Sequence, residues 1–411
     1  MTRLPSRLKV PTWILVWILT RAYMLAQVGL WDHVNGVEYE DVKSYESWSN
    51  TLALDHVLPN EETWQYPPGA ALLFLIPRLG PLDFKLTFVI LMLAFDLVGF
   101  LLVRQLADRE SRDTGVWIWL LGMPALGAVP LLRFDIVPTV IGVAALLVIH
   151  RRPTWFGALA GLGATVKVWP AFVLFGEWDR GRLLRSAAAT AATVAAVFAL
   201  AWIAFGDQSG FFTNQNDRGL QIEAVAAAPW QLREVITGEP LPIAQRYGTS
   251  EIDSPAGEAV ATLLDAVAVL VLLAAAWWWW LRDRAIRRGR EDLADEVLAR
   301  DFVFTVVLLF LVTSRVLSPQ FMVWMVGLAA VVLSARTTRL ARPAWFVLAS
   351  MLLSHSLGES PGRAVTRDLV LIAATIDASW TMFLAVRERP SASGSEAASA
   401  LSRSAAVPAR R

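Results

Sequence analysis

The chain of 411 residues contains no cysteine and only four histidines. The absence of cysteine excludes disulfide bonds, thiolate metal sites and cysteine nucleophiles. The histidines, at positions 33, 56, 150 and 355, do not have the spacing of metal ligands, so neither a metal site nor a cofactor is expected. The net charge is +1, and the chain therefore has no overall field that would attract nucleic acid.

Apolar residues are abundant instead, at 55% of the chain, and there are 19 tryptophans. The runs at 11–30 and 261–281 approach the roughly 20 residues that a helix needs to cross a bilayer. Trp277 to Trp280 precede a basic loop, as is typical of an aromatic belt at a membrane interface. The first apolar run is long and lacks a clear cleavage site, so we interpret it as a retained span. The sequence thus predicts an all-α polytopic membrane protein.

The positive-inside rule assigns the basic segments to the cytoplasm and so threads the chain. Spans are predicted at about 12–31, 84–103, 114–132, 136–149, 186–205, 259–281, 302–313, 320–334, 343–357 and 368–386. Residues 66–77 are too short and rich in proline for a span and are predicted to be interfacial or re-entrant. Basic residues flank 154–178 on both sides, which favours two short helices hinged at 167–170.

This threading predicts one multi-span domain, residues 12–386, with outer loops at 32–66 and 206–258. Residues 1–11 form a cytoplasmic N-terminus, and 387–411 form a disordered cytoplasmic tail. The unusual polar side chains all fall on the outer face: Asp41, Arg133, Asp135, Lys167, Arg218, Glu223, Arg315 and Gln320. Since polar groups near lipid are costly, their convergence predicts an active site at the membrane surface.

Asp41, Tyr45 and Trp48 are spaced at i, i+4 and i+7, so a helix would present them on one face. A carboxylate on such a helix can act as general base toward an acceptor hydroxyl. Taken alone, Asp41 would be interpreted as a solvated acid. Tyr66 lies in a Trp-Gln-Tyr-Pro-Pro segment that is held extended, either as a site element or as an aromatic anchor.

Arg133 and Asp135 lie two residues apart in a tight junction, where they either pair or position a phosphate and a hydroxyl. Lys167 is a lone cation in an apolar run, which indicates anion binding more than snorkelling. Arg218 and Glu223 belong to an outer segment that suits a sugar or a phosphate, or is a plain polar loop. Arg315, with Gln320 after it, either binds a phosphate or snorkels to headgroups.

These motifs, in this order, resemble the polyprenyl-phosphate-sugar-dependent glycosyltransferases of the GT-C fold. The chain is similar to members of glycosyltransferase family 87, such as the actinobacterial mannosyltransferases of phosphatidylinositol mannoside and lipomannan synthesis. The resemblance covers roughly residues 12 to 386. It rests on Asp41 with Tyr45, the motif at 64–68, Arg-Phe-Asp at 133–135, Val-Lys-Val-Trp-Pro around Lys167, and the segments 218–223 and 314–320.

The resemblance implies a GT-C bundle of about 10 to 12 transmembrane helices. It also implies an inverting transfer of a sugar, with mannose as the default, from a polyprenyl-phosphate donor to a lipid-linked glycan at the outer face of the cytoplasmic membrane. Asp41 corresponds to the base, and Asp32 is its rival. Lys167 and Arg315 correspond to ligands of the donor phosphate, with Arg133 and Arg218 as second candidates; Tyr45, Tyr66, Asp135, Glu223 and Gln320 complete the substrate site.

Three other functions stay open at this point. A lipid-linked sugar transporter or flippase would show inverted repeats and charges at mid-membrane, and the sequence shows neither. A polysaccharide polymerase or ligase would be expected to carry histidine in its large outer loop, and residues 206–258 contain none. An arabinofuranosyltransferase of the same fold differs only in pocket shape, which the sequence does not specify.

Overall fold

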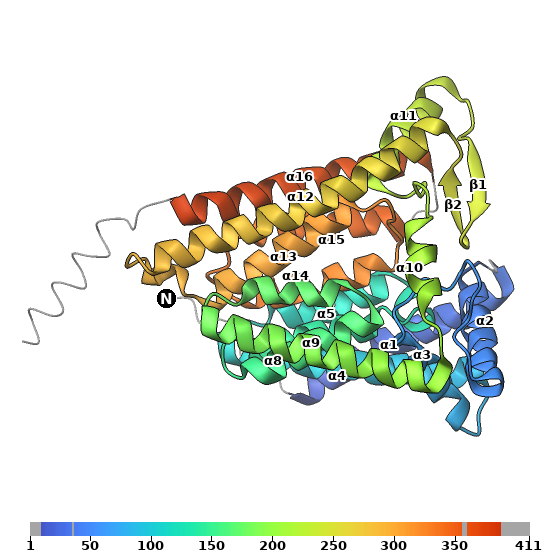
Figure 1. Ribbon diagram of the computed structural model, residues 1–411, viewed down its shortest axis with the longest axis horizontal. Coiled ribbons are helices and arrows are strands. Elements are labelled where there is room, and N and C mark those ends of the chain that lie inside the picture. Colours follow the sequence, from blue (N-terminus) through green and yellow to red (C-terminus); the bar gives the residue numbers. More distant parts are fainter. Residues whose placement is uncertain (1–9, 35–36, 356–359, 388–411) are drawn as a thin grey trace, which may run out of the picture.

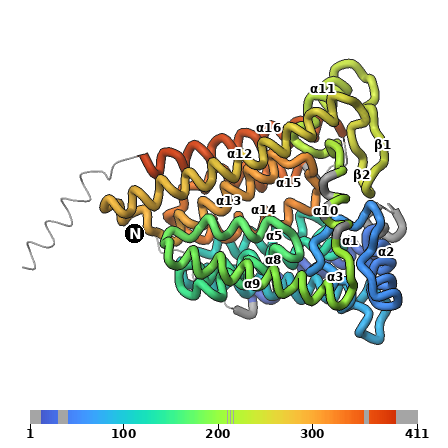
Figure 2. Tube along the Cα trace, in the orientation of Figure 1, coloured from blue at the N-terminus to red at the C-terminus, as the bar shows by residue number. Residues whose placement is uncertain are grey.

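Long helices run along the longest axis of the molecule, and short elements gather at one end of it (Figure 1). The structure, a computed structural model, describes residues 10–34, 37–355 and 360–387. The predicted tail and most of the predicted N-terminal segment lie outside these residues, as does the side chain of Asp32. In Figure 2 the first half of the chain, from blue to green, lies on one side of the bundle. The second half, from yellow to red, lies on the other.

The first half is helical and interrupted by short non-helical junctions. Its elements are α1 (Val10–Val34), α2 (Val37–Asn50), η1 (Thr51–Asp55), α3 (Ala70–Leu75), η2 (Ile76–Leu79), α4 (Phe84–Glu110), α5 (Thr114–Ala125), α6 (Val129–Leu132), α7 (Ile136–Val148), α8 (Pro153–Val166), η3 (Trp169–Gly176) and α9 (Arg180–Phe205). The prediction of a hinge near Lys167 is confirmed, because α8 ends at Val166 and Lys167 is extended, with φ −150° and ψ 142°. The second of the two short helices is the 3-10 segment η3.

The second half contains the long segment 206–254 with its short elements, followed by five longer helices. Its elements are α10 (Ser209–Asn216), η4 (Val225–Ala227), α11 (Ala228–Thr237), β1 (Ile243–Arg246), β2 (Thr249–Ile252), α12 (Pro255–Ile286), η5 (Glu291–Leu293), α13 (Glu296–Thr313), α14 (Phe321–Ser334), α15 (Ala341–His355) and α16 (Pro361–Arg387). The predicted span at 302–313 is too short, since α13 begins at Glu296, where the Asp295 side chain accepts from Leu298 N and caps the helix.

Strands β1 and β2 form an antiparallel hairpin that the sequence analysis missed. Ile243 pairs with Ile252 and Arg246 with Thr249, so Tyr247 and Gly248 form a two-residue turn. Both turn residues have positive φ, 54° and 70°, as the hairpin turn type that matches strand twist requires. The segment alternates weakly and carries no apolar face, which explains why its pattern did not indicate strands.

Four of the described helices are long and apolar enough to cross a membrane: α4, α9, α12 and α16. The shorter helices α7 and α14 are almost wholly buried between them, together with most of α13. By contrast, only 6% of the apolar window of α9 and 17% of that of α12 is buried within the protein. Apolar side chains that face outward over such lengths are expected where lipid, rather than protein, covers a helix.

Close packing of α8 on α9 uses small residues in the spacing known from membrane helices. A Cβ on Gly161 would lie 2.7 Å from the carbonyl oxygen of Thr190, and one on Gly157 would overlap the carbonyl of Ser186. Two hydroxyls bond across this contact, from Ser186 to Pro153 O at 3.1 Å and from Thr190 to Gly157 O at 2.8 Å.

A buried ion pair joins α1 to α4 deep in the bundle. Arg21 donates to both carboxylate oxygens of Asp96 at 2.7 Å, and the indole nitrogens of Trp17 and Trp119 donate to the same carboxylate. Both charged side chains are at most 2% exposed. The charges are thus paired and hydrogen-bonded, as charges buried among apolar helices must be.

Candidate active site

The candidate site lies at the end of the bundle where α2, α3, α10, α11 and the hairpin gather (Figure 1). The spacing of Asp41, Tyr45 and Trp48 predicts a helix, and α2 confirms it. Tyr45 and Trp48 are buried in the core, whereas Asp41 is half-buried at its edge. One face of α2 therefore anchors the helix through its rings and presents the carboxylate at the edge.

Asp41 pairs with Arg133 across two elements. Arg133 ends α6 in an extended conformation, which turns its side chain toward α2, and its guanidinium contacts the Asp41 carboxylate. The Asp41 side chain is 30% exposed and that of Arg133 19%. The pair is accessible to solvent, so a ligand entering from this end can exchange partners with it.

Asp135 binds two donors that come from distant segments. The Lys167 ammonium donates to its Oδ1 at 2.6 Å, and the Trp324 indole nitrogen donates to the same oxygen at 2.7 Å. Asp135 is fully buried, and Lys167 is 8% exposed. The end of α8 at Val166 makes this possible, because Lys167 then adopts an extended conformation that directs its side chain out of the helix.

Four aromatic rings surround the Lys167 ammonium. Its nitrogen lies 5.0 Å from the centroids of Phe134 and Phe321, 5.3 Å from Trp324 and 5.7 Å from Tyr66. Rings within about 6 Å attract a cation through their negative faces. This enclosure, which we call the lysine box, fixes the ammonium between α7, α14 and the Tyr66 segment.

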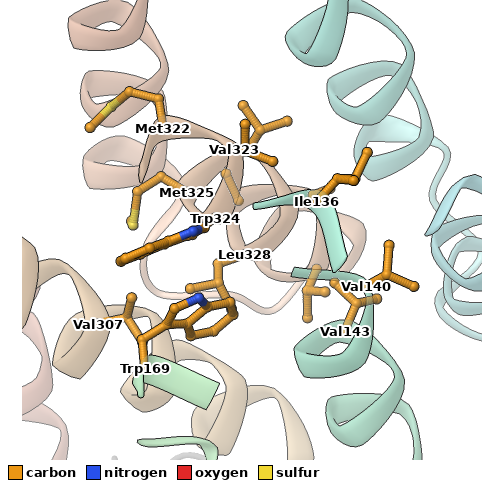
Figure 3. Close-up of a cluster of buried hydrophobic side chains, with 14 of the residues drawn as sticks. Ile136, Val140, Val143, Trp169, Val307, Met322, Val323, Trp324, Met325 and Leu328 are labelled. Carbon is orange, nitrogen blue, oxygen red and sulfur yellow. The ribbon is translucent and has the colours of Figure 1, made fainter. Parts of the chain in front are cut away.

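Trp324 of the lysine box belongs to a cluster of buried apolar side chains contributed by α7, α13, α14 and η3 (Figure 3). Trp169 and Trp324 stack there, with ring centroids 5.6 Å apart and planes at 26°. Val307, Leu328 and Met325 lie around them. This packing restricts the rotamer of Trp324 and so holds the indole nitrogen against Asp135.

Tyr45 lies next to Tyr66, which is one of the four rings of the lysine box. Tyr45 is fully buried and stacks on Phe74, with centroids 4.7 Å apart. Tyr66 packs its edge against Phe134 at 4.9 Å. Burial, together with the negative charge of Asp135, raises the pKa of Tyr66 well above its usual value. Tyr66 therefore acts as a neutral hydroxyl, able to donate and to accept.

Arg218 connects the segment that carries Gln65 to the hairpin. Its guanidinium donates to Gln65 Oε1 at 2.6 Å and to Thr249 Oγ1 at 2.9 Å, and it lies 3.7 Å from Glu251. Burial lowers the pKa of Arg218, and the charge of Glu251 opposes that effect. These partners show that Arg218 holds the hairpin against the segment that carries Tyr66.

Arg315 and Gln320 both precede the start of α14. The Arg315 guanidinium lies 3.4 Å from the Asp265 carboxylate, and the Arg315 carbonyl accepts a bond from Gln221 N at 3.0 Å. Gln320 is the N-cap residue of α14 and is buried, directly before Phe321 of the lysine box. Both residues therefore belong to the same end of the molecule as Lys167.

Glu223 lines a cavity together with Gln231 and two arginines of α16, Arg363 and Arg367. None of the other predicted site residues is among the residues that line this cavity. The sequence analysis also missed the rings of Phe134, Phe321 and Trp324. The first two stand next to the predicted Asp135 and Gln320, which was the available indication. Among the described residues, no group of three His, Asp or Glu side chains is arranged to hold a metal ion.

The fold and the site define a multi-span membrane protein with paired charges gathered at one end of its helices. The model of glycosyltransferase family 87 matches residues 64–310, more than half of the 411 residues, so the chain belongs to this family. Its members are membrane glycosyltransferases of the GT-C fold, which act in general on a lipid-linked sugar donor and an acceptor. Neither the curated proteins nor the solved structures give a significant match.

Family membership makes the chain a transferase, which decides against the transporter that the sequence left open. The matched region contains Tyr66, Arg133, Asp135, Lys167, Arg218 and Glu223. Asp41 and Tyr45 precede it, and Arg315 and Gln320 follow it. The structure nevertheless places Asp41 against Arg133, so a residue outside the matched region contacts one inside it.

Proposed function

We propose that the protein is an inverting mannosyltransferase that takes mannose from a polyprenyl-phosphate donor and attaches it to a lipid-linked glycan. Asp41 acts as the general base. The single observation that supports Asp41 most is its access: its side chain is 30% exposed, whereas Asp135 is fully buried and bonded to Lys167 and Trp324. A base must come within hydrogen-bond reach of the hydroxyl whose proton it takes.

The reaction is a single displacement at the anomeric carbon. The acceptor oxygen forms the new glycosidic bond as its proton passes to Asp41, and the bond from the anomeric carbon to the phosphate oxygen breaks. The electron pair leaves with the polyprenyl phosphate. Cations placed where that charge develops lower the barrier, and Arg133, Lys167 and Arg315 are the candidates. A double displacement would require a second carboxylate about 5 Å from the first, and the reaction proposed here needs none.

Arg133 has a second role in this proposal, because it starts the reaction paired with Asp41. A donor phosphate that takes over the guanidinium would leave the Asp41 carboxylate available to the acceptor hydroxyl. Arginine suits such an exchange, since its planar fork binds carboxylate and phosphate in the same geometry. Donor binding and activation of the base are thereby coupled.

We propose further that the site faces the outside of the cytoplasmic membrane. Basic residues concentrate in the junctions at 150–152, 180–185, 282–290 and 336–342, as expected of cytoplasmic segments. None of the proposed site residues belongs to these junctions. Polyprenyl-phosphate sugars would then be used from the outer leaflet, together with a glycolipid acceptor in the same leaflet.

The test is transfer of radiolabelled mannose from polyprenyl-phosphate-mannose to a membrane lipid extract by the purified protein. Wild type is compared with Asp41→Ala and with Asp55→Ala, an exposed acid of the same outer segment. We expect transfer by wild type and Asp55→Ala, and its loss in a folded Asp41→Ala variant. Undiminished activity of Asp41→Ala would remove Asp41 from the mechanism. Transfer only from a polyprenyl-phosphate-arabinofuranose donor would show that the transferred sugar is arabinofuranose and not mannose.

A further inference from the structure

A cavity of about 170 Å³ lies between the segment 222–241 and the start of α16. Its volume is well above the roughly 30 Å³ that one water molecule occupies in the liquid, so it admits a ring-sized group. Polar side chains from three segments line it, with apolar ones between them: Glu223, Gln231, Leu241, Pro319, Arg363 and Arg367. The reaction proposed above assigns a role to none of these side chains.

Gln231 lines this cavity and has an acceptor without a hydrogen-bond partner among the described residues. The side chain is 4% exposed, and its amide nitrogen donates to Ile222 O at 2.5 Å. Its Oε1 is buried and has no hydrogen-bond partner among the described residues. Leaving a buried acceptor unsatisfied costs about 1–3 kcal/mol, so a ligand that donates a hydrogen bond there would be stabilised.

The opposite wall supplies donors. Arg363 and Arg367 are at positions i and i+4 in the first turns of α16, so they lie on one face of that helix. Arg367 is fixed by Asp368 at 2.8 Å and by a bond to the carbonyl oxygen of Glu223 at 2.6 Å. The positive end of the α16 dipole adds to their field.

The combination of these groups selects a kind of ligand. Guanidinium groups only donate, and the Gln231 oxygen and the Glu223 carboxylate only accept. A fully ionised phosphate cannot donate to Gln231, and Glu223 repels it. A hydroxyl does both, and several hydroxyls on one ring satisfy both walls at once. Leu241 and Pro319 offer apolar surface to the C–H face of such a ring.

We infer that this cavity binds a sugar ring of the acceptor glycolipid, and thus forms an acceptor subsite distinct from the lysine box. The inference rests on the proposed function. Pro319 lines the cavity, and the next two residues, Gln320 and Phe321, lead directly into the lysine box. An acceptor held in the cavity therefore has one wall in common with the donor site, as a transfer between two bound substrates requires.

The test is direct binding of octyl α-mannoside, kept below its micelle concentration, followed by intrinsic tryptophan fluorescence. Wild type is compared with Gln231→Leu and Glu223→Gln, and with Gln245→Leu as a matched control on the exposed hairpin. We expect binding about three- to tenfold weaker in the first two variants, the loss of one hydrogen bond, and unchanged in the third. Thermal unfolding of each variant confirms that it is folded.

Octyl phosphate provides the opposing probe. The inference is overturned if octyl phosphate binds the wild type more tightly than the mannoside does, or if Gln231→Leu binds the mannoside as well as wild type. In turnover, Gln231→Leu should raise the KM for the acceptor and leave the KM for the donor unchanged. Because the binding measurement needs no turnover, mannoside binding without any mannose transfer would contradict the proposed function and leave the subsite standing.

Discussion

Lys167 and Trp324 donate to the same oxygen of Asp135, at 2.6 and 2.7 Å, from segments that lie far apart in the sequence. The other carboxylate oxygen, Oδ2, is buried without a hydrogen-bond partner in the described part of the chain. The charge of Asp135 is thus balanced by a single ammonium, itself enclosed by aromatic rings. Each of the two ions depends on the other for its neutralisation.

Removing Lys167 alone should therefore destabilise the protein strongly. We expect Lys167→Met to lower the free energy of unfolding by about 3–5 kcal/mol, since it leaves a buried carboxylate uncompensated. The double variant Lys167→Met, Asp135→Asn should recover much of this loss. Unfolding in detergent, followed by tryptophan fluorescence, measures both. The exposed Lys43→Met is the control, and an equal loss in single and double variants would contradict the pairing.

Arg133 should matter to rate more than to stability, because its pair with Asp41 is partly exposed. If it also stabilises the leaving phosphate, Arg133→Met should reduce kcat by about 10²–10³, the usual cost of losing one transition-state donor. Initial rates with wild type and Arg133→Lys complete the comparison. A variant that melts several degrees lower and keeps its kcat would show that the pair serves only the fold.

The Arg21–Asp96 pair is expected to behave as a structural element of the bundle. Asp96→Asn should cost about 3–5 kcal/mol, because the Arg21 charge stays buried between α1 and α4. Asp108→Asn, which breaks the exposed pair with Arg104, should change stability by less than about 1 kcal/mol. Chemical denaturation of the two variants in the same detergent provides the measurement. Equal effects would mean that water reaches Asp96.

Gly157 tests the packing of α8 on α9, and Gly29 is its control. A Cβ at Gly157 would overlap the backbone of α9, whereas one at Gly29 on α1 meets nothing within 4 Å. We expect Gly157→Ala to destabilise the protein and Gly29→Ala to stabilise it by up to about 1 kcal/mol through helix propensity. Opposite shifts in melting temperature would confirm the close contact of α8 with α9, and shifts of the same sign would contradict it.

Stability should fall in mild acid because of His150. This side chain lies at the junction before α8, with Nδ1 2.8 Å from Glu177 Oε1. Burial lowers the pKa of His150 below its usual 6.5, an effect that the hydrogen bond to Glu177 opposes. The unfolded chain takes up this proton near pH 6.5 and the folded protein only at lower pH. The stability is therefore complete above pH 6.5 and decreases as the pH falls through the folded pKa.

Melting temperatures between pH 5 and pH 8 test this dependence. His150→Gln should flatten the acid side of the profile, whereas the exposed His56→Gln should leave it unchanged. A profile that keeps its full slope in His150→Gln would assign the acid sensitivity to another group.

Local patterns predicted much of the scaffold. The i, i+4, i+7 spacing of Asp41, Tyr45 and Trp48 was enough to predict α2, since it depends on helix geometry alone. Basic residues on both flanks predicted the break at Lys167, because a single crossing would leave one flank on the wrong side. Both predictions are confirmed by the structure.

The grouping of side chains within the site was less predictable, because it depends on contacts between distant segments. The rings around Lys167 come from three separate segments of the chain, and only Phe321 and Trp324, three residues apart on α14, are related by helix spacing. Gln221 donates to the Arg315 carbonyl, whereas Glu223, two residues later, lines a cavity that neither Gln221 nor Arg315 lines. Sequence proximity does not tell which side of an irregular segment a side chain faces. The roles of the site residues stay predictions.

Helix α9 combines an almost fully outward-facing surface with firmly held ends. At its start, Arg182 donates to the carbonyl of His150 at 2.6 Å. Just beyond its end, Asn214 donates to the carbonyls of Glu61 and Trp64. Residues on the face of α9 that turns away from α8 can therefore be substituted without displacing the helix. Because the chain has no native cysteine, a fluorophore attached through a cysteine introduced near the exposed Leu200 would label that position alone. Its emission would report how deeply this position lies in the bilayer.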